Sequence, residues 1–124
     1  FASVVHDSAV ISPNTEFFEG VQIMAGAIIQ AGSTIGINSI INSRANIDHD
    51  TIIGAHVHIA PGVTISGGVR IDDGTLIGAG ATIKQEIKIG SNCIVAAGAV
   101  VIRDVPAGTT VMGVPARVVE RKLN

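Results

Sequence analysis

The chain has 124 residues, of which 47% are apolar and 15% charged, and its formal net charge is −2 at neutral pH. This weak negative charge offers no electrostatic basis for binding nucleic acid or a membrane surface. The longest apolar stretch, about 95–102, contains a glycine and is far shorter than the ~20 residues that a spanning helix needs. We expect one cytoplasmic domain over residues 1–124, with no nucleic-acid partner and no membrane insertion.

The aromatic content is unusually low for a folded domain. Trp and Tyr are absent, and Phe occurs three times. A wide globular core usually relies on large aromatic side chains. The abundance of Ile, Val and Ala therefore indicates a thin core that repeats along the chain.

A six-residue repeat begins near the amino terminus and continues without a miss to Val101. Large apolar residues occupy every position in this phase: Val5, Ile11, Phe17, Ile23, Ile29, Ile35, Ile41, Ile47, Ile53, Ile59, Ile65, Ile71, Ile77, Ile83, Ile89, Val95 and Val101. A second column, two residues earlier, contains small or β-branched residues. None of the 34 positions in the two columns is Asp, Glu, Lys or Arg. Both columns are therefore predicted to be buried.

The spacing predicts an all-β solenoid. Residues two apart in an extended segment face the same way, so a period of six implies a short strand, a bend and another short strand. Three such sides close a triangular coil of about eighteen residues, and the repeat is long enough for five to six coils. Glycines follow the large column residue at several bends: Gly36, Gly54, Gly78 and Gly90.

The repeat loses its phase from about Asp104. The sequence Val105-Pro106-Ala107-Gly108 predicts a turn, and the next positions in phase are small. We expect a short C-terminal tail over 115–122, which is either a short helix or an extended arm against a neighbour.

Several motifs resemble the hexapeptide-repeat acyltransferases, a superfamily of bacterial enzymes. They are the Ile-Gly hexads, Ile77-Gly78-Ala79-Gly80-Ala81-Thr82-Ile83, Ala97-Gly98-Ala99-Val100-Val101, and the ending Asp104-Val105-Pro106-Ala107-Gly108 with Gly113-Val114-Pro115-Ala116-Arg117. Other segments resemble the subgroup of sialic acid O-acetyltransferases and amino-sugar N-acetyltransferases: Val5-His6-Asp7-Ser8-Ala9-Val10-Ile11-Ser12, Asn46-Ile47-Asp48-His49-Asp50 and Ile53-Gly54-Ala55-His56-Val57-His58.

This resemblance implies a left-handed parallel β-helix that forms a homotrimer with active sites between subunits. It implies acetyl-CoA as co-substrate and an amino group on a nucleotide-linked deoxy-amino-sugar as acceptor, in bacterial glycan biosynthesis. A hydroxyl of a sialic acid or another sugar is the alternative acceptor. The subgroup usually carries a nucleotide-sugar-binding domain before the β-helix, so we expect this chain to be the C-terminal domain of a longer protein.

His49 is the candidate general base. It lies between Asp48 and Asp50 at a bend, and a neighbouring carboxylate stabilises a protonated imidazole. By itself this pattern is more typical of a surface histidine in an acidic bend. The resemblance implies that His49 is the catalytic base and that Asp50 orients or strengthens it.

His58 and Asn42 are the next candidates. In the subgroup, the histidine at the position of His58 contacts the acetyl end of acetyl-CoA, and the asparagine at the position of Asn42 lies near the acceptor. His49 and His58 are nine residues apart, which is half a coil. They are therefore about one prism edge apart, and we expect them to meet only across a subunit interface.

Coenzyme binding in this fold relies on backbone amides. The subgroup's coenzyme-contacting amides correspond to Ala79 and Ala97, which are eighteen residues apart and are predicted to stack on adjacent coils. Gly67 is a candidate amide for the thioester oxygen or the pantetheine arm. Each of these small residues could equally serve only a tight bend. Arg117 is either a ligand for a coenzyme phosphate or a solvated charge of the tail.

Other readings of the sequence are weaker. Cys93 falls in the inward column of small residues, so we expect it in the core. His49, His56 and His58 are spaced seven and two residues apart, which does not resemble a β-helix zinc site, and His6 lies more than two coils away, so we expect no metal. A non-catalytic β-helix scaffold is the alternative from another class of function, because a fold does not determine a function.

Overall fold

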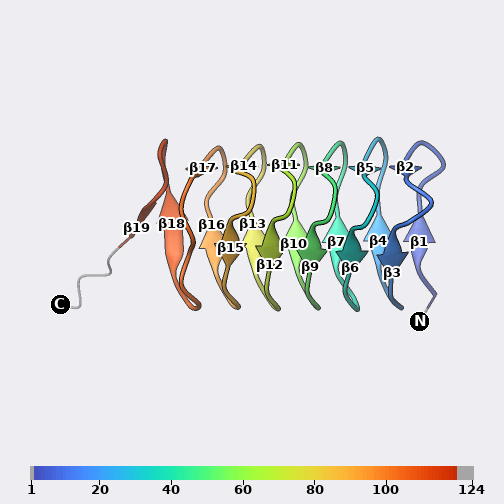
Figure 1. Cartoon of the computed structure of the whole chain (residues 1–124), viewed down its shortest axis with the longest axis horizontal. Coiled ribbons are helices and arrows are strands. Elements are labelled where there is room, and N and C mark those ends of the chain that lie inside the picture. Colours follow the sequence, from blue (N-terminus) through green and yellow to red (C-terminus); the bar gives the residue numbers. More distant parts are fainter. Residues whose placement is uncertain (1, 120–124) are drawn as a thin grey trace.

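A computed structural model describes residues 2–119 and shows a three-sided parallel β-solenoid, the left-handed β-helix that the resemblance implies. Its coils stack along one axis, so that the first and last described residues lie at opposite ends (Figure 1). Each strand has two or three residues. Among residues 2–119 no helix is long and apolar enough to cross a bilayer.

The three faces of the prism are three sheets. Sheet A contains β1 (Val4–Val5), β4 (Gln22–Ile23), β7 (Ile40–Ile41), β10 (His58–Ile59), β13 (Leu76–Ile77), β16 (Ile94–Val95), β18 (Thr110–Met112) and β19 (Arg117–Val118). Sheet B contains β2 (Val10–Ile11), β5 (Ile28–Ile29), β8 (Asn46–Ile47), β11 (Thr64–Ile65), β14 (Thr82–Ile83) and β17 (Val100–Val101). Sheet C contains β3 (Glu16–Phe17), β6 (Thr34–Ile35), β9 (Ile52–Ile53), β12 (Arg70–Ile71) and β15 (Lys88–Ile89). The six strands of sheet B mark six successive coils, which confirms the predicted number.

Each residue stacks on the equivalent residue of the next coil. Ile59, for example, pairs in parallel register with Ile41 on one side and Ile77 on the other. The predicted columns fill the centre of the prism: every large member from Ile23 to Val101 is buried. The prediction is wrong for the first coil, where Val5 and Phe17 are 39% and 36% exposed, because no described coil covers them.

Hydroxyl groups are accommodated in the core by bonding between coils. The buried Ser39 Oγ donates to the Gly54 carbonyl at 2.7 Å and accepts from the Val57 amide at 3.0 Å. Thr75 bonds in the same way to Gly90 O and Cys93 N. Buried hydroxyls therefore cost little here, because both their donor and their acceptor functions are satisfied.

The glycines that follow the large column residues are required by close approach between coils. A Cβ on Gly78 would lie 2.5 Å from the Ala97 nitrogen, and one on Gly90 would lie 2.5 Å from the Ala107 nitrogen. Positive φ angles occur instead two residues later in the bends, as at Gly80 with φ +69°. The glycines that follow the large column residues are therefore needed for close packing between coils and not for a positive φ angle.

The phase break near Asp104 shortens a coil without ending the solenoid. Val105 forms a parallel bridge with Ile89, and β18 pairs in parallel with β16. Val105 and Val111 are both buried, so they take over from the column that stops at Val101. The chain then turns, and β19 pairs antiparallel with β18. The extended alternative for the tail is therefore correct up to residue 119. The tail packs on the last coil of its own chain instead of on a neighbour. Residues 120–122 lie outside the described residues.

Replacing Ile53 by Ala should lower the free energy of unfolding by about 2–5 kcal/mol, because the side chain is 1% exposed and its loss leaves a cavity between coils. Its neighbour Ile52 is 47% exposed on the outer face of sheet C and provides a matched control. Urea unfolding at fixed protein concentration measures both variants. Equal losses for the two variants would contradict the assignment of inward and outward positions.

Candidate active site

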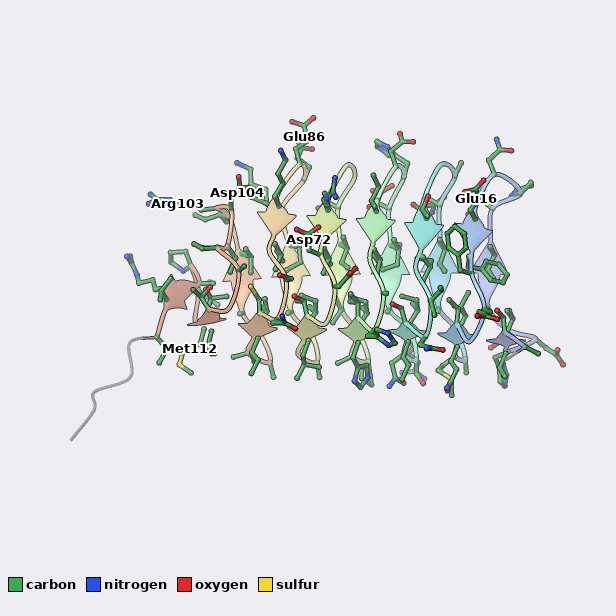
Figure 2. All side chains as sticks on the ribbon, turned by 90° about the horizontal axis from the view of Figure 1, so that it is seen from below. Glu16, Asp72, Glu86, Arg103, Asp104 and Met112 are labelled. Carbon is green, nitrogen blue, oxygen red and sulfur yellow. The ribbon has the colours of Figure 1, made fainter. Side chains whose placement is uncertain are left out.

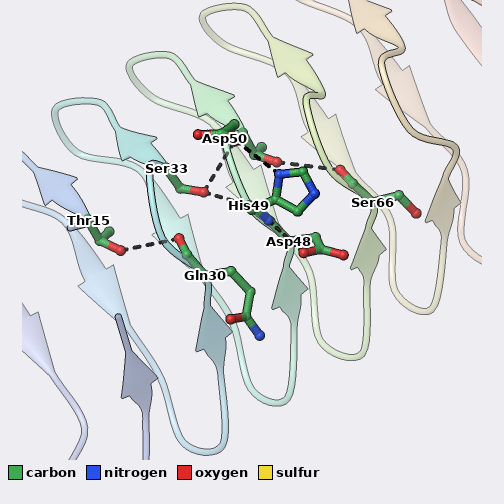
Figure 3. Close-up of polar contacts among 8 residues, drawn as sticks. Thr15, Gln30, Ser33, Asp48, His49, Asp50 and Ser66 are labelled. Atoms are coloured by element: carbon green, nitrogen blue, oxygen red, sulfur yellow. Dashed lines mark hydrogen bonds and ion pairs between the residues drawn. The ribbon is translucent and has the colours of Figure 1, made fainter. Parts of the chain in front are cut away.

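The bends between sheets form three corners that run the length of the prism. We call the turns that follow sheet A strands the AB corner, those that follow sheet B strands the BC corner, and those that follow sheet C strands the CA corner. His49 and Asp50 lie on the BC corner, between β8 and β9. Figure 3 shows them on one turn, with Ser33 on the preceding coil and Ser66 on the following one.

The backbone of this turn is held on both sides. The Asp48 carboxylate accepts the His49 amide at 2.7 Å, and the Asp50 amide donates to the Ala31 carbonyl of the preceding coil at 3.0 Å. Asp50 has a φ of +55°, a left-handed conformation that aspartate tolerates better than most residues. Its carboxylate lies directly over Gly32, where any Cβ would collide with the Asp50 Oδ1.

The His49 and Asp50 side chains form a hydrogen bond that sets the tautomer of the neutral imidazole. His49 Nδ1 lies 3.0 Å from Asp50 Oδ2, and the side chains are 63% and 71% exposed. An ionised carboxylate can only accept a hydrogen bond, so Nδ1 carries the proton. The lone pair of the neutral ring is therefore on Nε2, the nitrogen that does not face Asp50. This is the arrangement of a general base.

Gly67 of the next coil lies beneath the ring of His49. A Cβ at Gly67 would be 2.7 Å from both Nε2 and Cε1 of the imidazole, and Gly67 is buried although it occupies a bend. Sequence reasoning identified Gly67 through its amide and missed both this role and that of Gly32. The signal was present in the register, since Gly67 follows His49 by eighteen residues and Gly32 precedes Asp50 by eighteen.

His58 and Asn42 lie together at the start of the AB corner. Asn42 Nδ2 is 3.4 Å from His58 Nε2, and Asn42 Oδ1 accepts the Ser43 amide at 2.7 Å. The Ser43 N–H can only donate, which identifies Oδ1 and leaves Nδ2 as a donor toward His58. His58 Nε2 is thus the acceptor, and its Nδ1 carries the proton. His49 and His58 therefore present opposite functions, a lone pair and an N–H.

The two histidines lie on opposite sides of one chain. His49 is on the BC corner, which is the corner opposite sheet A, and His58 is in β10 of sheet A. The structure therefore brings Asn42 to His58 and Asp50 to His49, and it keeps the two pairs apart. This separation agrees with the distance expected from their nine-residue spacing.

The remaining candidates lie toward the C-terminal end. Ala79 and Ala97 are stacked on the AB corner, and the Gly98 amide donates to the Ala79 carbonyl at 2.9 Å. Within residues 2–119 neither the Ala79 nor the Ala97 amide donates a hydrogen bond, so both can reach a ligand. Arg117 in β19 lines a cavity of about 280 Å³ together with Arg103 and Pro115.

The single cysteine and the two remaining histidines each have a different environment. Cys93 is buried, and its thiol lies 3.1 Å from the Pro106 carbonyl, which confirms that it belongs to the core. His6 Nδ1 is 2.8 Å from the Ser8 hydroxyl, and His56 is exposed on the CA corner. Within the described part of the chain, no three metal-ligating side chains come together.

The fold and this site define a hexapeptide-repeat β-helix protein with an exposed histidine–carboxylate pair. The sequence profile described as "Bacterial transferase hexapeptide (six repeats)" matches residues 32–67 and 68–103. The chain belongs to this family. A comparison with curated protein sequences gave no match.

Several solved structures are closely similar to this chain. PerB from Caulobacter crescentus, solved in complex with CoA and GDP-perosamine, is 41% identical with a TM-score of 0.95, over 96% of this chain and 57% of that one. The acetyltransferase domain of PglB from Neisseria gonorrhoeae, with acetyl coenzyme A, is 40% identical with a TM-score of 0.93, over 94% and 57%. WeeI from Acinetobacter baumannii is 37% identical with a TM-score of 0.91, over 93% and 57%. The chain thus spans little more than half the length of these relatives.

Replacing Gly67 by Ala should displace the imidazole of His49, because the new methyl group would occupy the space beneath the ring. We expect a loss of turnover with the fold retained, as judged by circular dichroism. A double-mutant cycle with His49→Ala separates the roles: if Gly67 acts through the ring, Gly67→Ala has much less effect on the residual activity of the His49→Ala variant. An equal effect in both backgrounds would contradict this role for Gly67.

Proposed function

We propose that the chain is an acetyl-CoA-dependent N-acetyltransferase that modifies the amino group of a nucleotide-linked deoxy-amino-sugar in bacterial glycan biosynthesis. Membership of the hexapeptide transferase family supports acyl transfer. The similarity to PerB in complex with CoA and GDP-perosamine, and to PglB with acetyl coenzyme A, supports the two substrates. No observation on this chain favours a sugar hydroxyl as acceptor.

The observation that carries the proposal is the His49–Asp50 pair, in which the His49 Nε2 has no hydrogen-bond partner among residues 2–119. Asp50 holds the Nδ1 proton, so Nε2 can take a proton from the acceptor amine as its nitrogen attacks the thioester carbon. Asp50 then stabilises the imidazolium. When the tetrahedral intermediate collapses, the C–S bond breaks and the imidazolium returns its proton to the CoA thiolate. No acyl-enzyme is needed, because the acceptor nitrogen attacks the thioester carbon directly and His49 only transfers the proton.

Donors for the developing oxyanion come from two places. The Gly67 amide donates no hydrogen bond within residues 2–119, and it lies under the ring that removes the proton. The His58 Nδ1–H is the second donor, since Asn42 occupies Nε2. In this proposal Ala79 and Ala97 bind the coenzyme arm through their amides, Arg117 meets a coenzyme phosphate, and Asn42 also borders the acceptor.

We propose further that the active form is a homotrimer with active sites between subunits. His49 and His58 are on opposite sides of one chain, so a common site requires two chains. The outer face of sheet A is suited to such contact, because Leu76, Ile94 and Met112 are 37%, 47% and 49% exposed there. Figure 2 shows Met112 at the lower edge of the solenoid and Glu86, on the BC corner, at the upper edge.

The wider setting of the domain is part of the same proposal. The similar structures are longer than this chain, which supports a β-helix domain that acts within a longer protein. The cytoplasmic location stays a prediction.

His49→Ala should lower turnover by roughly 10²–10⁴-fold, the usual contribution of a general base. A thiol-release assay with acetyl-CoA and a panel of nucleotide amino-sugars and sialic acids measures this and identifies the acceptor. His56→Ala removes an exposed histidine at another corner and provides the control. Near-normal turnover of the His49→Ala variant would refute the assignment of the base.

Mixing two inactive variants should restore activity if the site is shared. The His49→Ala and His58→Ala chains each lack one half of every site in their own homotrimers. Mixed trimers, formed by co-expression with two affinity tags, contain some sites with His49 from one chain and His58 from the other. We expect partial recovery of thiol release. No recovery in verified mixed trimers would contradict a shared site.

A further inference from the structure

A buried hydroxyl group bridges the two ends of the turn that carries His49 and Asp50. Ser33, on the preceding coil, is 1% exposed. Its Oγ donates a hydrogen bond to the Asp48 carbonyl at 3.0 Å and accepts one from the Thr51 amide at 3.2 Å. Figure 3 shows the Ser33 side chain directed toward this turn. One hydroxyl therefore holds both residues that flank the His49–Asp50 pair, with its donor and its acceptor function both used.

The Ser33 hydroxyl replaces the backbone bond that closes the equivalent turn of the first coil. There, the Thr15 amide donates directly to the Ser12 carbonyl at 3.2 Å. Among residues 2–119 no such direct bond joins the Thr51 amide to the Asp48 carbonyl. The hydroxyl oxygen lies between these two groups instead. The turn is therefore held more open than it would be if its own backbone closed it.

The shape of this turn determines where the imidazole lies. His49 and Asp50 are its two central residues, so their side chains move with the backbone between Asp48 and Thr51. The bond between His49 Nδ1 and Asp50 Oδ2 and the close approach of the ring to Gly67 both depend on that backbone. Without the hydroxyl, the Thr51 amide can bond directly to the Asp48 carbonyl. The turn would then tighten and displace both central side chains.

We propose that Ser33 is a positioning residue, which fixes the His49–Asp50 pair by keeping this turn open. The inference rests on the proposed function, in which His49 is the base. Thr75 makes the same two bonds in the turn 90–93, which carries none of the candidate site residues. A buried hydroxyl of this kind is therefore a structural device of the fold. At Ser33 the device acts on the turn that holds the base.

Two substitutions of equal size separate the hydroxyl of Ser33 from the volume of its side chain. Ser33→Thr keeps the hydroxyl and Ser33→Val lacks it, and the equivalent positions on the neighbouring coils already hold Thr51 and Val69. We expect kcat for thiol release to be roughly 10- to 10²-fold lower for Ser33→Val than for Ser33→Thr, because a displaced base acts poorly in the transition state. The KM values for both substrates should stay unchanged.

Thr75→Val is the matched control, because it removes the same two bonds from the turn 90–93 at the same burial. It should lower the urea midpoint of unfolding about as much as Ser33→Val does, and leave kcat unchanged. Ser33→Ala also removes the hydroxyl and takes the place of Ser33→Val if that variant does not fold. Equal kcat values for the two Ser33 variants, or an equal loss of kcat in Thr75→Val, would overturn the inference.

The ring nitrogens of His49 provide a test that does not need activity. In protein labelled with nitrogen-15 at histidine, their chemical shifts report which nitrogen carries the proton. We expect the Nδ1–H form in the wild type and in Ser33→Thr, and a larger share of the Nε2–H form in Ser33→Val, with the shifts of His56 unchanged. If the wild type releases no thiol with any acceptor, the proposed function fails, and this comparison still decides the role of Ser33. Unchanged His49 shifts in the Ser33→Val variant would reject that role.

Discussion

The structure depends on one constraint, the stacking of each residue on its equivalent eighteen residues away. The parallel ladders of all three sheets keep this register, as in the pairing of Ile59 with Ile41 and Ile77. The register buries the two apolar columns in a core only one side chain wide. It also explains why the core needs no large aromatic residues, since each coil adds the same few aliphatic groups. A substitution in a buried column is therefore felt by the coils above and below.

The same register shapes the candidate site. His49 and Asp50 project from one exposed turn, yet each is supported by a glycine of an adjacent coil, Gly67 and Gly32. A side chain at a prism corner has few neighbours in its own coil, so its orientation must come from the coils beside it. The backbone of Asp50 also contributes to this support, because its positive φ places the carboxylate over Gly32. The position of the base is thus a property of three coils.

The sequence was sufficient to predict the solenoid, its number of coils and its core. A strict period leaves few alternatives, and even the burial of Cys93 follows from its phase. The ends were harder. Burial requires a covering coil, which Val5 and Phe17 lack, and periodicity does not report coverage. The continuation through Val105 and Val111 was missed because a shortened coil shifts the phase while the stacking persists.

The site could be predicted as a set of residues more readily than as a set of contacts. The contact between Asn42 and His58 joins positions sixteen apart, and it depends on which amide atom Ser43 engages. The assignment of the Asn42 amide atoms matters for the chemistry, because it leaves the Nδ1 of His58 as a donor. Asp50, in contrast, leaves the Nε2 of His49 as an acceptor. The fold then holds donor and acceptor on opposite sides of each chain. A lone chain therefore has both halves of the chemistry but cannot apply them to one substrate, which makes catalysis in the proposed enzyme conditional on assembly.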